Sequence, residues 1–283
     1  MAKKILVSPI LKWVGGKRQL LSEILPMINI KSSSIYVEPF LGGGAVLFDL
    51  QPKKAIVNDY NDELINVYLT VRDSAEELIT ELEKHSVNNT EDYYYEVRSL
   101  DRSEKYREMS NVEKAARILY LNKTCYNGLY RVNLAGQFNS PYGKYKNPNI
   151  VNATAIRAMS KYLNENKIEI CNGDYRDVLK RVRKGSFVYL DPPYMPISSS
   201  ASFTGYTENG FSYEQQVALK NECDKLRKKG IAFVQSNSDC PEIRELYKEY
   251  EIKTVQAKRA INSDASKRGE INEVLIYYVP NEK

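Results

Sequence analysis

The chain has a single histidine among its 283 residues, and its four cysteines are far apart. One histidine excludes a multi-histidine metal site and leaves little room for a serine-type triad. His85 lies at a predicted helix end before a polar loop, where we expect a surface histidine without a chemical role. The cysteines are separated by 46, 52 and 17 positions with no C-x-x-C pair, which fits neither zinc-site spacing nor a disulfide framework. We therefore expect a reduced, cytoplasmic protein without a metal site.

Long apolar runs are also missing. None approaches the roughly eighteen residues of a membrane-spanning helix. The start, Met1 to Ser8, has two lysines but too short an apolar stretch for the signal peptide of a secreted protein. The composition, with 42% apolar and 27% charged residues, is close to globular averages. A chain of 283 residues suits one large α/β domain, or one domain with an insertion.

Acidic residues are absent from 51 consecutive positions, residues 114–164, which we call the acid-free window. The window carries a charge of +8, while the whole chain has only +5. Its cations are interleaved with tyrosine and amide side chains, a mixture typical of nucleic-acid binding. A solvated helix face that lacks acids by chance is the alternative. The cations are Lys114, Arg117, Lys123, Arg131, Lys144, Lys146, Arg157 and Lys161.

Strand-like and helix-like segments alternate along much of the chain. Apolar runs rich in β-branched and aromatic residues predict buried strands at 35–40, 55–58, 168–171, 187–190, 231–235, 252–256 and 274–279. Segments with a 3.6-residue period predict helices at 17–28, 62–72, 75–85, 112–124, 153–164 and 213–229. This alternation indicates an α/β fold with a mostly parallel sheet. The last two runs are joined by a long polar loop, which predicts a terminal antiparallel hairpin.

Strand-like runs vanish in the middle of the chain, where helices are followed by a loop rich in Gly, Asn and Pro. We expect an α/β domain formed by residues 1–61 and 150–283, and a mainly helical insertion at 62–149. The loop of residues 259–269, with Arg259, Lys267 and Arg268, is either a further phosphate contact or a solvated hairpin tip.

The most specific motif is Asp191-Pro192-Pro193-Tyr194, directly after a predicted buried strand. Ligands of open parallel sheets bind beyond the carboxyl ends of the strands. The two prolines fix the backbone and remove two N–H donors. The motif thus offers a carboxylate and a carbonyl as acceptors for an amino group, beside a ring that can stack on it.

Other motifs also stand at predicted strand ends. Glu38-Pro39-Phe40-Leu41-Gly42-Gly43-Gly44 lets the backbone approach a ligand closely, although it lacks the G-x-G-x-x-G spacing of a dinucleotide site. Asn58-Asp59-Tyr60 offers a carboxylate for ribose hydroxyls, or a helix N-cap. Gly173-Asp174-Tyr175 adds another acid, and Lys12 to Lys17 contains the only tryptophan, Trp13.

In order, the chain contains K-W-x-G-G-K, E-P-F-x-G-G-G, N-D-Y, N-G-L-x-R-x-N with F-N-x-P-x-G, and D-P-P-Y. This series, from Lys12 to Tyr194, resembles the Dam-type DNA adenine methyltransferases. The resemblance implies a Rossmann-like methyltransferase sheet, S-adenosylmethionine as cofactor, double-stranded DNA as partner and the insertion as target-recognition domain. Family members with these recognition blocks methylate GATC, which is the expected target.

The resemblance also implies a set of site residues. The catalytic tetrapeptide would be Asp191, Pro192, Pro193 and Tyr194. The cofactor would contact Trp13, Lys17, Glu38, Phe40, Gly42, Gly43, Gly44, Asp59, Tyr60, Asp174, Tyr175 and Asp191. DNA would contact Lys12, Tyr126, Asn127, Leu129, Arg131, Asn133, Asn139 and Pro141, with Tyr126 as the wedge that fills the place of the flipped base.

The chemistry of an adenine amino group fits the same residues. Its lone pair is delocalised into the ring, so Asp191 and the Pro192 carbonyl would accept its hydrogens and direct the lone pair at the methyl group. Such direct in-line transfer needs no metal and no histidine. Because the amino group is buried in duplex DNA, the base must be flipped out at a cost of a few kcal/mol. The enzyme is expected to act as a monomer on DNA.

Two other functions remain open from the sequence. A methyltransferase of RNA or of protein amide groups also tolerates an N/D-P-P-Y motif, and it is disfavoured by Asp191 and by the long basic insertion. A non-catalytic nucleic-acid-binding module would need the acid-free window but neither Asp191 nor the glycine run.

Overall fold

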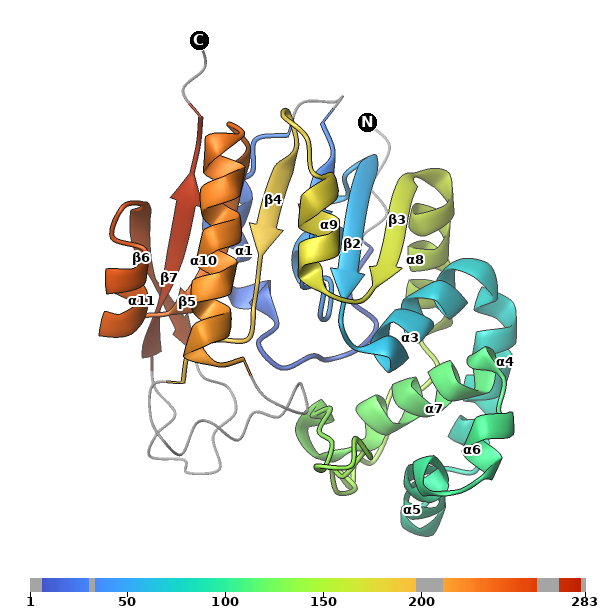
Figure 1. The fold of residues 1–283 in the computed structure, drawn as a ribbon. Helices are drawn as coiled ribbons and strands as arrows, with labels where there is room; N and C mark the ends of the chain where they lie inside the picture. Colours follow the sequence, from blue (N-terminus) through green and yellow to red (C-terminus); the bar gives the residue numbers. More distant parts are fainter. Residues whose placement is uncertain (1–6, 31–33, 197–210, 259–269, 281–283) are drawn as a thin grey trace. The chain divides into compact units, whose positions relative to one another are not determined.

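The computed structural model of the chain describes residues 7–30, 34–196, 211–258 and 270–280 (Figure 1). The loop of residues 259–269, a candidate phosphate contact, lies outside the described residues. The chain forms two compact units. Unit 1 comprises Met1–Gly16, Gly42–Gln51 and Asp59–Gly173, and unit 2 comprises Lys17–Leu41, Pro52–Asn58 and Asp174–Lys283.

The sheet has seven strands in the order β3-β2-β1-β4-β5-β7-β6. The pairs β1–β2, β1–β4 and β4–β5 are parallel, whereas β7 is antiparallel to both β5 and β6. The expected α/β sheet, mostly parallel with a C-terminal antiparallel hairpin, is thereby confirmed. The strands are β1 (Tyr36–Glu38), β2 (Lys54–Asp59), β3 (Lys167–Asn172), β4 (Phe187–Leu190), β5 (Ala232–Ser238), β6 (Glu251–Lys258) and β7 (Glu270–Tyr278).

The strand order reverses between β1 and β4, because the chain winds outward from these two central strands in opposite directions. Both strands are entirely buried, and all their residues except Glu38 are apolar or aromatic. They pair through Tyr36 with Phe187 and through Val37 with Val188, so their carboxyl ends lie side by side. Ligands of doubly wound sheets bind outside the strand ends at such a switch point.

The helices of unit 2 include α9 (Tyr175–Arg181) and α10 (Tyr213–Lys228), which cover one face of the sheet in Figure 1. The prediction of a single helix at residues 17–28 was wrong. The segment instead forms η1 (Lys17–Leu20), α1 (Leu21–Ile24) and η2 (Leu25–Met27), because Pro26 has no N–H to continue α-helical hydrogen bonding. The short helices α9 and α11 (Pro241–Leu246) had not been predicted.

The helices of unit 1 surround α7 (Asn111–Thr124), which packs against α3, α4 and α5. Side-chain caps start several of them: Asn61 caps α3, and Ser110 with Glu113 forms a capping box on α7. The other helices of this unit are α2 (Ala45–Leu50), α3 (Asp62–Asp73), α4 (Ala75–Val87), α5 (Glu91–Ser99), η3 (Leu100–Arg102), α6 (Lys105–Glu108), η4 (Tyr126–Gly128) and α8 (Ala153–Glu165). The expected insertion, residues 62–149, lies wholly within unit 1.

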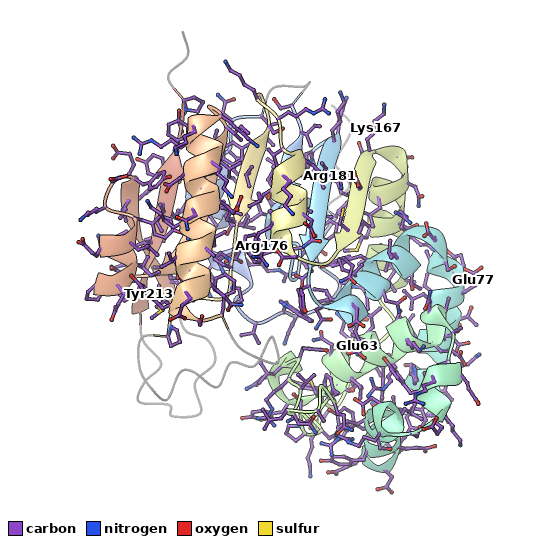
Figure 2. All side chains as sticks on the ribbon, in the orientation of Figure 1. Glu63, Glu77, Lys167, Arg176, Arg181 and Tyr213 are labelled. Carbon is purple, nitrogen blue, oxygen red and sulfur yellow. The ribbon has the colours of Figure 1, made fainter. Side chains whose placement is uncertain are left out.

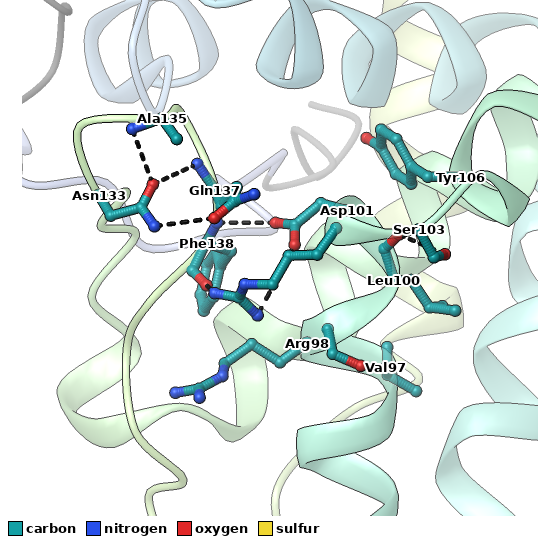
Figure 3. Close-up of polar contacts among 12 residues, drawn as sticks. Val97, Arg98, Leu100, Asp101, Ser103, Tyr106, Asn133, Ala135, Gln137 and Phe138 are labelled. Carbon is teal, nitrogen blue, oxygen red and sulfur yellow. Dashed lines mark hydrogen bonds and ion pairs between the residues drawn. The ribbon is translucent and has the colours of Figure 1, made fainter.

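After α7 the chain forms a hairpin loop, residues 126–142. Tyr126 N donates to the Pro141 carbonyl at 2.8 Å, and Asn139 N donates to the Arg131 carbonyl at 2.9 Å. The tip is closed by Asn133, whose Oδ1 accepts from the backbone N–H groups of Ala135 and Gln137 (Figure 3). Asparagine favours such turns because its side chain bonds to nearby backbone groups.

The acid-free window does not form a +8 surface, which corrects the expectation from the sequence. Arg117 is fully buried, where it pairs with Asp101 at 2.8 Å and approaches Glu63. Three other cations pair with carboxylates outside the window: Lys144 with Glu91, Arg157 with Glu76 and Lys161 with Glu165. These four of the eight cations are neutralised in space by acids that are distant in sequence or lie just beyond the end of the window.

His85 was expected at the surface, but it is half-buried in an aromatic cluster of unit 1. Its ring stacks on Tyr120 with centroids 4.8 Å apart, and its Nδ1 lies 2.8 Å from the Tyr93 hydroxyl. Burial lowers the pKa of His85 to about 4.

Candidate active site

The tetrapeptide Asp191 to Tyr194 directly follows β4, beside the end of β1 at the switch point of the sheet. Side chains from two other elements hold the segment in place. Gln216 on α10 donates to the Pro193 carbonyl at 2.9 Å, and Asn237 on β5 accepts from Met195 N at 3.1 Å. The strand end thus gives the tetrapeptide a fixed backbone course.

Lys17 joins the two polar members of the tetrapeptide. Its Nζ lies 2.8 Å from Asp191 Oδ1 and 4.7 Å from the centre of the Tyr194 ring. The ammonium group is buried, with the side chain only 6% exposed, against 20% for Asp191. Lys17 therefore neutralises the carboxylate and lies over the phenol ring at the same time.

The Tyr194 hydroxyl donates to Glu273 Oε2 at 2.6 Å. Burial raises the pKa of Tyr194 well above its usual value of 10, and the negative charges of Asp191 and Glu273 act in the same direction. Tyr194 therefore remains a neutral phenol whose ring is held from its far end.

The tetrapeptide contains two acceptors of the kind that suits an amino group. Asp191 is a carboxylate, a group with about four lone-pair sites in all, and one of its oxygens pairs with Lys17. The Pro193 carbonyl already accepts from Gln216, whereas within the described part of the chain no donor reaches the Pro192 carbonyl. The geometry distinguishes the two prolines: Pro192 can accept from a ligand, and Pro193 fixes the loop.

Aromatic rings gather beyond the end of β1. Phe40 packs against Tyr175, the first residue of α9, with centroids 4.9 Å apart, and Phe211 lies near both rings. Glu38 is buried and accepts a hydrogen bond from Tyr36 at 2.8 Å. These rings offer flat apolar contact for a planar ligand group.

Asp174 caps the N-terminus of α9 and pairs with Arg176, which is labelled on this helix in Figure 2. The Arg176 guanidinium lowers the pKa of the Asp174 carboxyl below its usual value. The carboxylate is half-buried and remains charged in neutral solution.

In unit 1, Asp59 holds the residues 42–44, which we call the glycine loop. Its Oδ2 accepts from Gly42 N at 2.8 Å, and its Oδ1 accepts from Asn61 N at 3.0 Å. Burial raises the pKa of Asp59, while the backbone N–H donors oppose that shift. The N-cap of α3 is Asn61, so the alternative role of Asp59 as N-cap is wrong.

The glycine loop leaves no room for side chains. Gly42 and Gly44 have φ of +49° and +66°, where residues with a Cβ are strained. A Cβ on Gly42 would lie 3.0 Å from the Trp13 ring, and one on Gly44 would lie 2.5 Å from Phe48. Trp13 and Phe48 thus fill the space where these side chains would stand, and Tyr68 fixes the loop by donating to the Gly42 carbonyl at 2.8 Å.

Unit 1 also gathers the residues that the resemblance assigns to DNA. Asn122 bonds both the N–H and the carbonyl of Lys12 at 2.8 Å, and its amide also reaches the Gly128 carbonyl. Lys12 is thereby held against the hairpin loop. The rest of the set lies in that loop: Tyr126, Asn127, Leu129, Arg131, Asn133, Asn139 and Pro141.

Within the hairpin loop, Tyr126 is 57% exposed and Asn127 has a φ of +57°. Arg131 is exposed and donates from Nε to Asn139 Oδ1 at 2.7 Å. The tyrosine ring and the paired arginine and asparagine are therefore presented on an ordered hairpin. Tyr60, which was assigned to the cofactor, is 70% exposed.

Sequence reasoning missed the residues that hold these groups. Gln216 and Glu273 fix the tetrapeptide, and Asn122 fixes Lys12. One supporting residue did have a signal in the sequence. Residues 235–238 are polar although they continue a buried apolar strand, and one of them, Asn237, accepts the hydrogen bond from Met195 N. The contacts of Gln216, Glu273 and Asn122 are long-range in sequence and have no local pattern.

Two searches of the described residues bear on other classes of protein. None of the helices there is long and apolar enough to cross a membrane. No group of three or more His, Cys, Asp or Glu side chains in these ranges is arranged to hold a metal ion.

Comparison with known proteins identifies the family. The model of the D12 class N6 adenine-specific DNA methyltransferases matches residues 13–261. The chain is 46% identical over 273 residues to the Type II methyltransferase M1.LlaDCHI of Lactococcus lactis subsp. cremoris, covering 96% of each protein. It is 42% identical over 288 residues to the Type II methyltransferase M.MjaIII of Methanocaldococcus jannaschii, covering 95% of this chain and 98% of the relative.

A third relative is the DNA adenine methylase of Escherichia coli, 34% identical over 272 residues, with 95% of each protein covered. The matches extend over nearly the whole chain, including the strand ends, the tetrapeptide and the hairpin loop. The chain therefore belongs to the D12 class N6 adenine-specific DNA methyltransferases, enzymes that use S-adenosylmethionine as methyl donor.

Proposed function

We propose that the enzyme flips an adenine out of duplex DNA and methylates its exocyclic amino group within GATC by direct in-line transfer, acting as a monomer. The observation that carries the proposal is the tetrapeptide Asp191 to Tyr194 at the switch point, where Gln216 fixes one carbonyl and leaves the other to a ligand. Residues 62–149 are proposed as the target-recognition domain.

The residues assigned to S-adenosylmethionine fit such a ligand. The glycine loop has no side chains of its own, so its backbone can approach a ligand closely. Asp59 has acceptor capacity left for ribose hydroxyls beside its two backbone bonds. The rings of Phe40 and Tyr175 offer a flat surface for an adenine. When bound, the cofactor supplies an electrophilic methyl group.

The cofactor set of the proposal is the one given by the resemblance: Trp13, Lys17, Glu38, Phe40, Gly42, Gly43, Gly44, Asp59, Tyr60, Asp174, Tyr175 and Asp191. Lys17 is proposed to support the site through another residue of the set. Its ammonium pairs with Asp191, so it acts on the carboxylate of the tetrapeptide.

The tetrapeptide activates the adenine nitrogen in this proposal. Asp191 and the Pro192 carbonyl accept the two amino hydrogens, which favours a pyramidal nitrogen with a directed lone pair. Tyr194 stacks on the base, and its ring is held by the bond to Glu273. Because these acceptors are fixed before the base arrives, little reorganisation is needed in the transition state.

The hairpin loop reads the sequence in this proposal. Tyr126 inserts where the flipped base was, because its ring is the exposed aromatic of the loop. Arg131 and Asn139 carry the donors and acceptors that read base edges in the major groove. Leu129, Asn127, Asn133, Pro141 and Lys12 complete the DNA contacts.

The proposal is tested with labelled S-adenosylmethionine and two duplexes of equal composition, one with GATC and one with the same four bases scrambled. We expect methyl transfer to the GATC duplex alone. Asp191→Ala should abolish transfer and leave the circular dichroism spectrum unchanged, whereas Asp177→Asn, at an exposed site on α9, should transfer normally. Equal transfer to both duplexes would reject GATC as the target.

Base flipping and sequence reading need separate measurements. A 2-aminopurine at the target position should brighten when the enzyme binds, and Tyr126→Ala should reduce that signal. Arg131→Ala should relax the preference at one base pair by about 1 to 3 kcal/mol. A uniform loss of affinity on all sequences would instead assign Arg131 to a phosphate.

A further inference from the structure

Trp13 lies between the glycine loop and the hairpin loop of unit 1. Two atoms of its ring lie 3.0 and 3.6 Å from where a Cβ on Gly42 would stand. The Cβ of Trp13 itself lies 3.2 Å from the corresponding point on Gly43. On the other side it stacks on Tyr130, with ring centroids 4.7 Å apart and planes inclined by 27°. One indole ring therefore contacts both loops.

A second connection runs through the hydroxyl group of Tyr130. This hydroxyl donates to Glu63 Oε2 at 2.8 Å and accepts from Asn61 Nδ2 at 3.3 Å. Asn61 in turn donates its backbone N–H to Asp59, which holds the glycine loop through Gly42. The two connections form a closed circuit that starts and ends at the glycine loop and passes through Tyr130.

Glu63 extends the circuit to the second strand of the hairpin. The residue lies on α3, as labelled in Figure 2, and its Oε1 accepts from the Tyr106 hydroxyl at 2.6 Å and lies 3.7 Å from Arg117. Arg117 pairs with Asp101, which accepts from Phe138 N at 2.7 Å (Figure 3).

The end of the circuit nearest the hairpin loop is buried and closely packed. Tyr130 is 6% exposed, Phe138 is 1% exposed and Arg117 is fully buried. The Phe138 ring meets the Tyr130 ring edge-on, with centroids 5.6 Å apart. Packed interiors of this kind do not deform continuously, so a displacement at one end is passed to the other.

Tyr130 is placed between two readers of the proposed target, Leu129 and Arg131. The Arg131 carbonyl accepts from Asn139 N, so the position of Tyr130 sets the course of both strands of the hairpin. A shift of Trp13 or Asp59 on ligand binding would therefore reach the side chains that face DNA.

We propose that Tyr130 and Glu63 are positioning residues that couple occupation of the cofactor site to the geometry of the hairpin loop. Each ligand then tightens the binding of the other, because both favour the same arrangement of the circuit. The inference rests on the proposed function, since it takes the glycine loop as a cofactor contact and the hairpin loop as the DNA contact.

The coupling is measured with four dissociation constants. S-adenosylhomocysteine, the demethylated product, binds without turnover, and its affinity is determined with and without a GATC duplex. The affinity of the duplex is determined with and without S-adenosylhomocysteine. Both ratios must agree, because coupling between two sites is reciprocal. For the wild-type chain we expect a ratio of at least about fivefold.

Tyr130→Phe keeps the stack on Trp13 and removes the hydroxyl alone, so the variant should fold. Its coupling ratio should fall below about twofold, while the affinity for S-adenosylhomocysteine alone stays within about threefold of wild type. Glu63→Gln keeps an acceptor for the hydroxyl and should give an intermediate ratio. Tyr95→Phe, at a half-exposed ring on α5, is the matched control and should retain the wild-type ratio.

The outcomes separate the inference from the proposed function. Wild-type coupling that persists unchanged in Tyr130→Phe and Glu63→Gln would overturn the roles of these residues. Independent binding of both ligands by the wild type would overturn the coupling and leave the proposed function standing. Failure of the wild type to bind S-adenosylhomocysteine or the duplex at all would instead count against the proposed function.

Discussion

Replacing Lys17 by methionine tests whether the Lys17–Asp191 pair supports catalysis. Methionine keeps the length and the apolar stem of the side chain and removes the charge. At 2.8 Å and an effective dielectric constant of about 20, the gross attraction of the pair is about 6 kcal/mol. Desolvation offsets most of that value, and removing one partner of a buried pair costs about 3 to 5 kcal/mol.

Asp191 retains 20% of its exposure, so water compensates part of the lost partner. We therefore expect the free energy of unfolding to fall by about 2 to 3 kcal/mol in Lys17→Met. If half of that energy also stabilises the transition state, the single-turnover rate of methyl transfer falls about tenfold. Urea denaturation and rapid-quench methylation measure the two quantities.

Unit 2 contains a matched control pair. Lys253 and Glu23 are also 2.8 Å apart, but their side chains are 47% and 42% exposed. Lys253→Met should therefore cost less than about 1 kcal/mol and leave the rate unchanged. Equal losses of stability in both variants would refute the argument from burial. If Lys17→Met is destabilised but transfers methyl groups at the wild-type rate, the role of Lys17 is structural only.

Three further changes have expected outcomes. In urea denaturation, Gly44→Ala should lower the free energy of unfolding by about 1 to 3 kcal/mol more than Gly185→Ala does. Both glycines have positive φ, but only at Gly44 does a ring lie 2.5 Å from the added carbon. The pKa of His85 is lowered from 6.5 to about 4, so between these values the unfolded chain binds a proton more readily than the folded chain. The free energy of unfolding should therefore be highest above pH 6.5 and should fall by about 2 to 3 kcal/mol as the pH drops to 4. His85→Gln should remove that part of the pH dependence. Lys146→Gln should reduce the salt slope of DNA binding by about 0.9, whereas Lys144→Gln, whose ammonium pairs with Glu91, should change it less.

The sheet was predictable because each strand is a short apolar run between polar turns. Central strands such as Phe187–Leu190 are buried on both faces, so no alternation is needed to recognise them. The segment 17–28 misled because its apolar period is helical, while Pro26 breaks the hydrogen bonding. Helix α9 has only seven residues, too few for a periodic pattern.

The candidate site was predictable where a motif stands at a strand end. The positions of Asp191 and Glu38 follow from the end of each strand, and the sheet brings these ends together. Apart from Asn237, the supporting groups were not predictable, because each comes from a distant part of the chain. Glu273, which holds Tyr194, is an example: it lies 79 residues further along and belongs to no motif.

The buried cations show why a charge count along the sequence overstates a DNA-binding surface. Arg117 lies in the acid-free window, yet its guanidinium group is buried in unit 1, where it pairs with Asp101 and approaches Glu63. Lys17 stands in the motif K-W-x-G-G-K, where a cation suggests a ligand contact, yet its Nζ pairs with Asp191. A buried cation that meets a carboxylate cannot also release counterions from DNA. These two residues therefore act by fixing acidic side chains, Asp101 behind the hairpin loop and Asp191 in the tetrapeptide that follows β4.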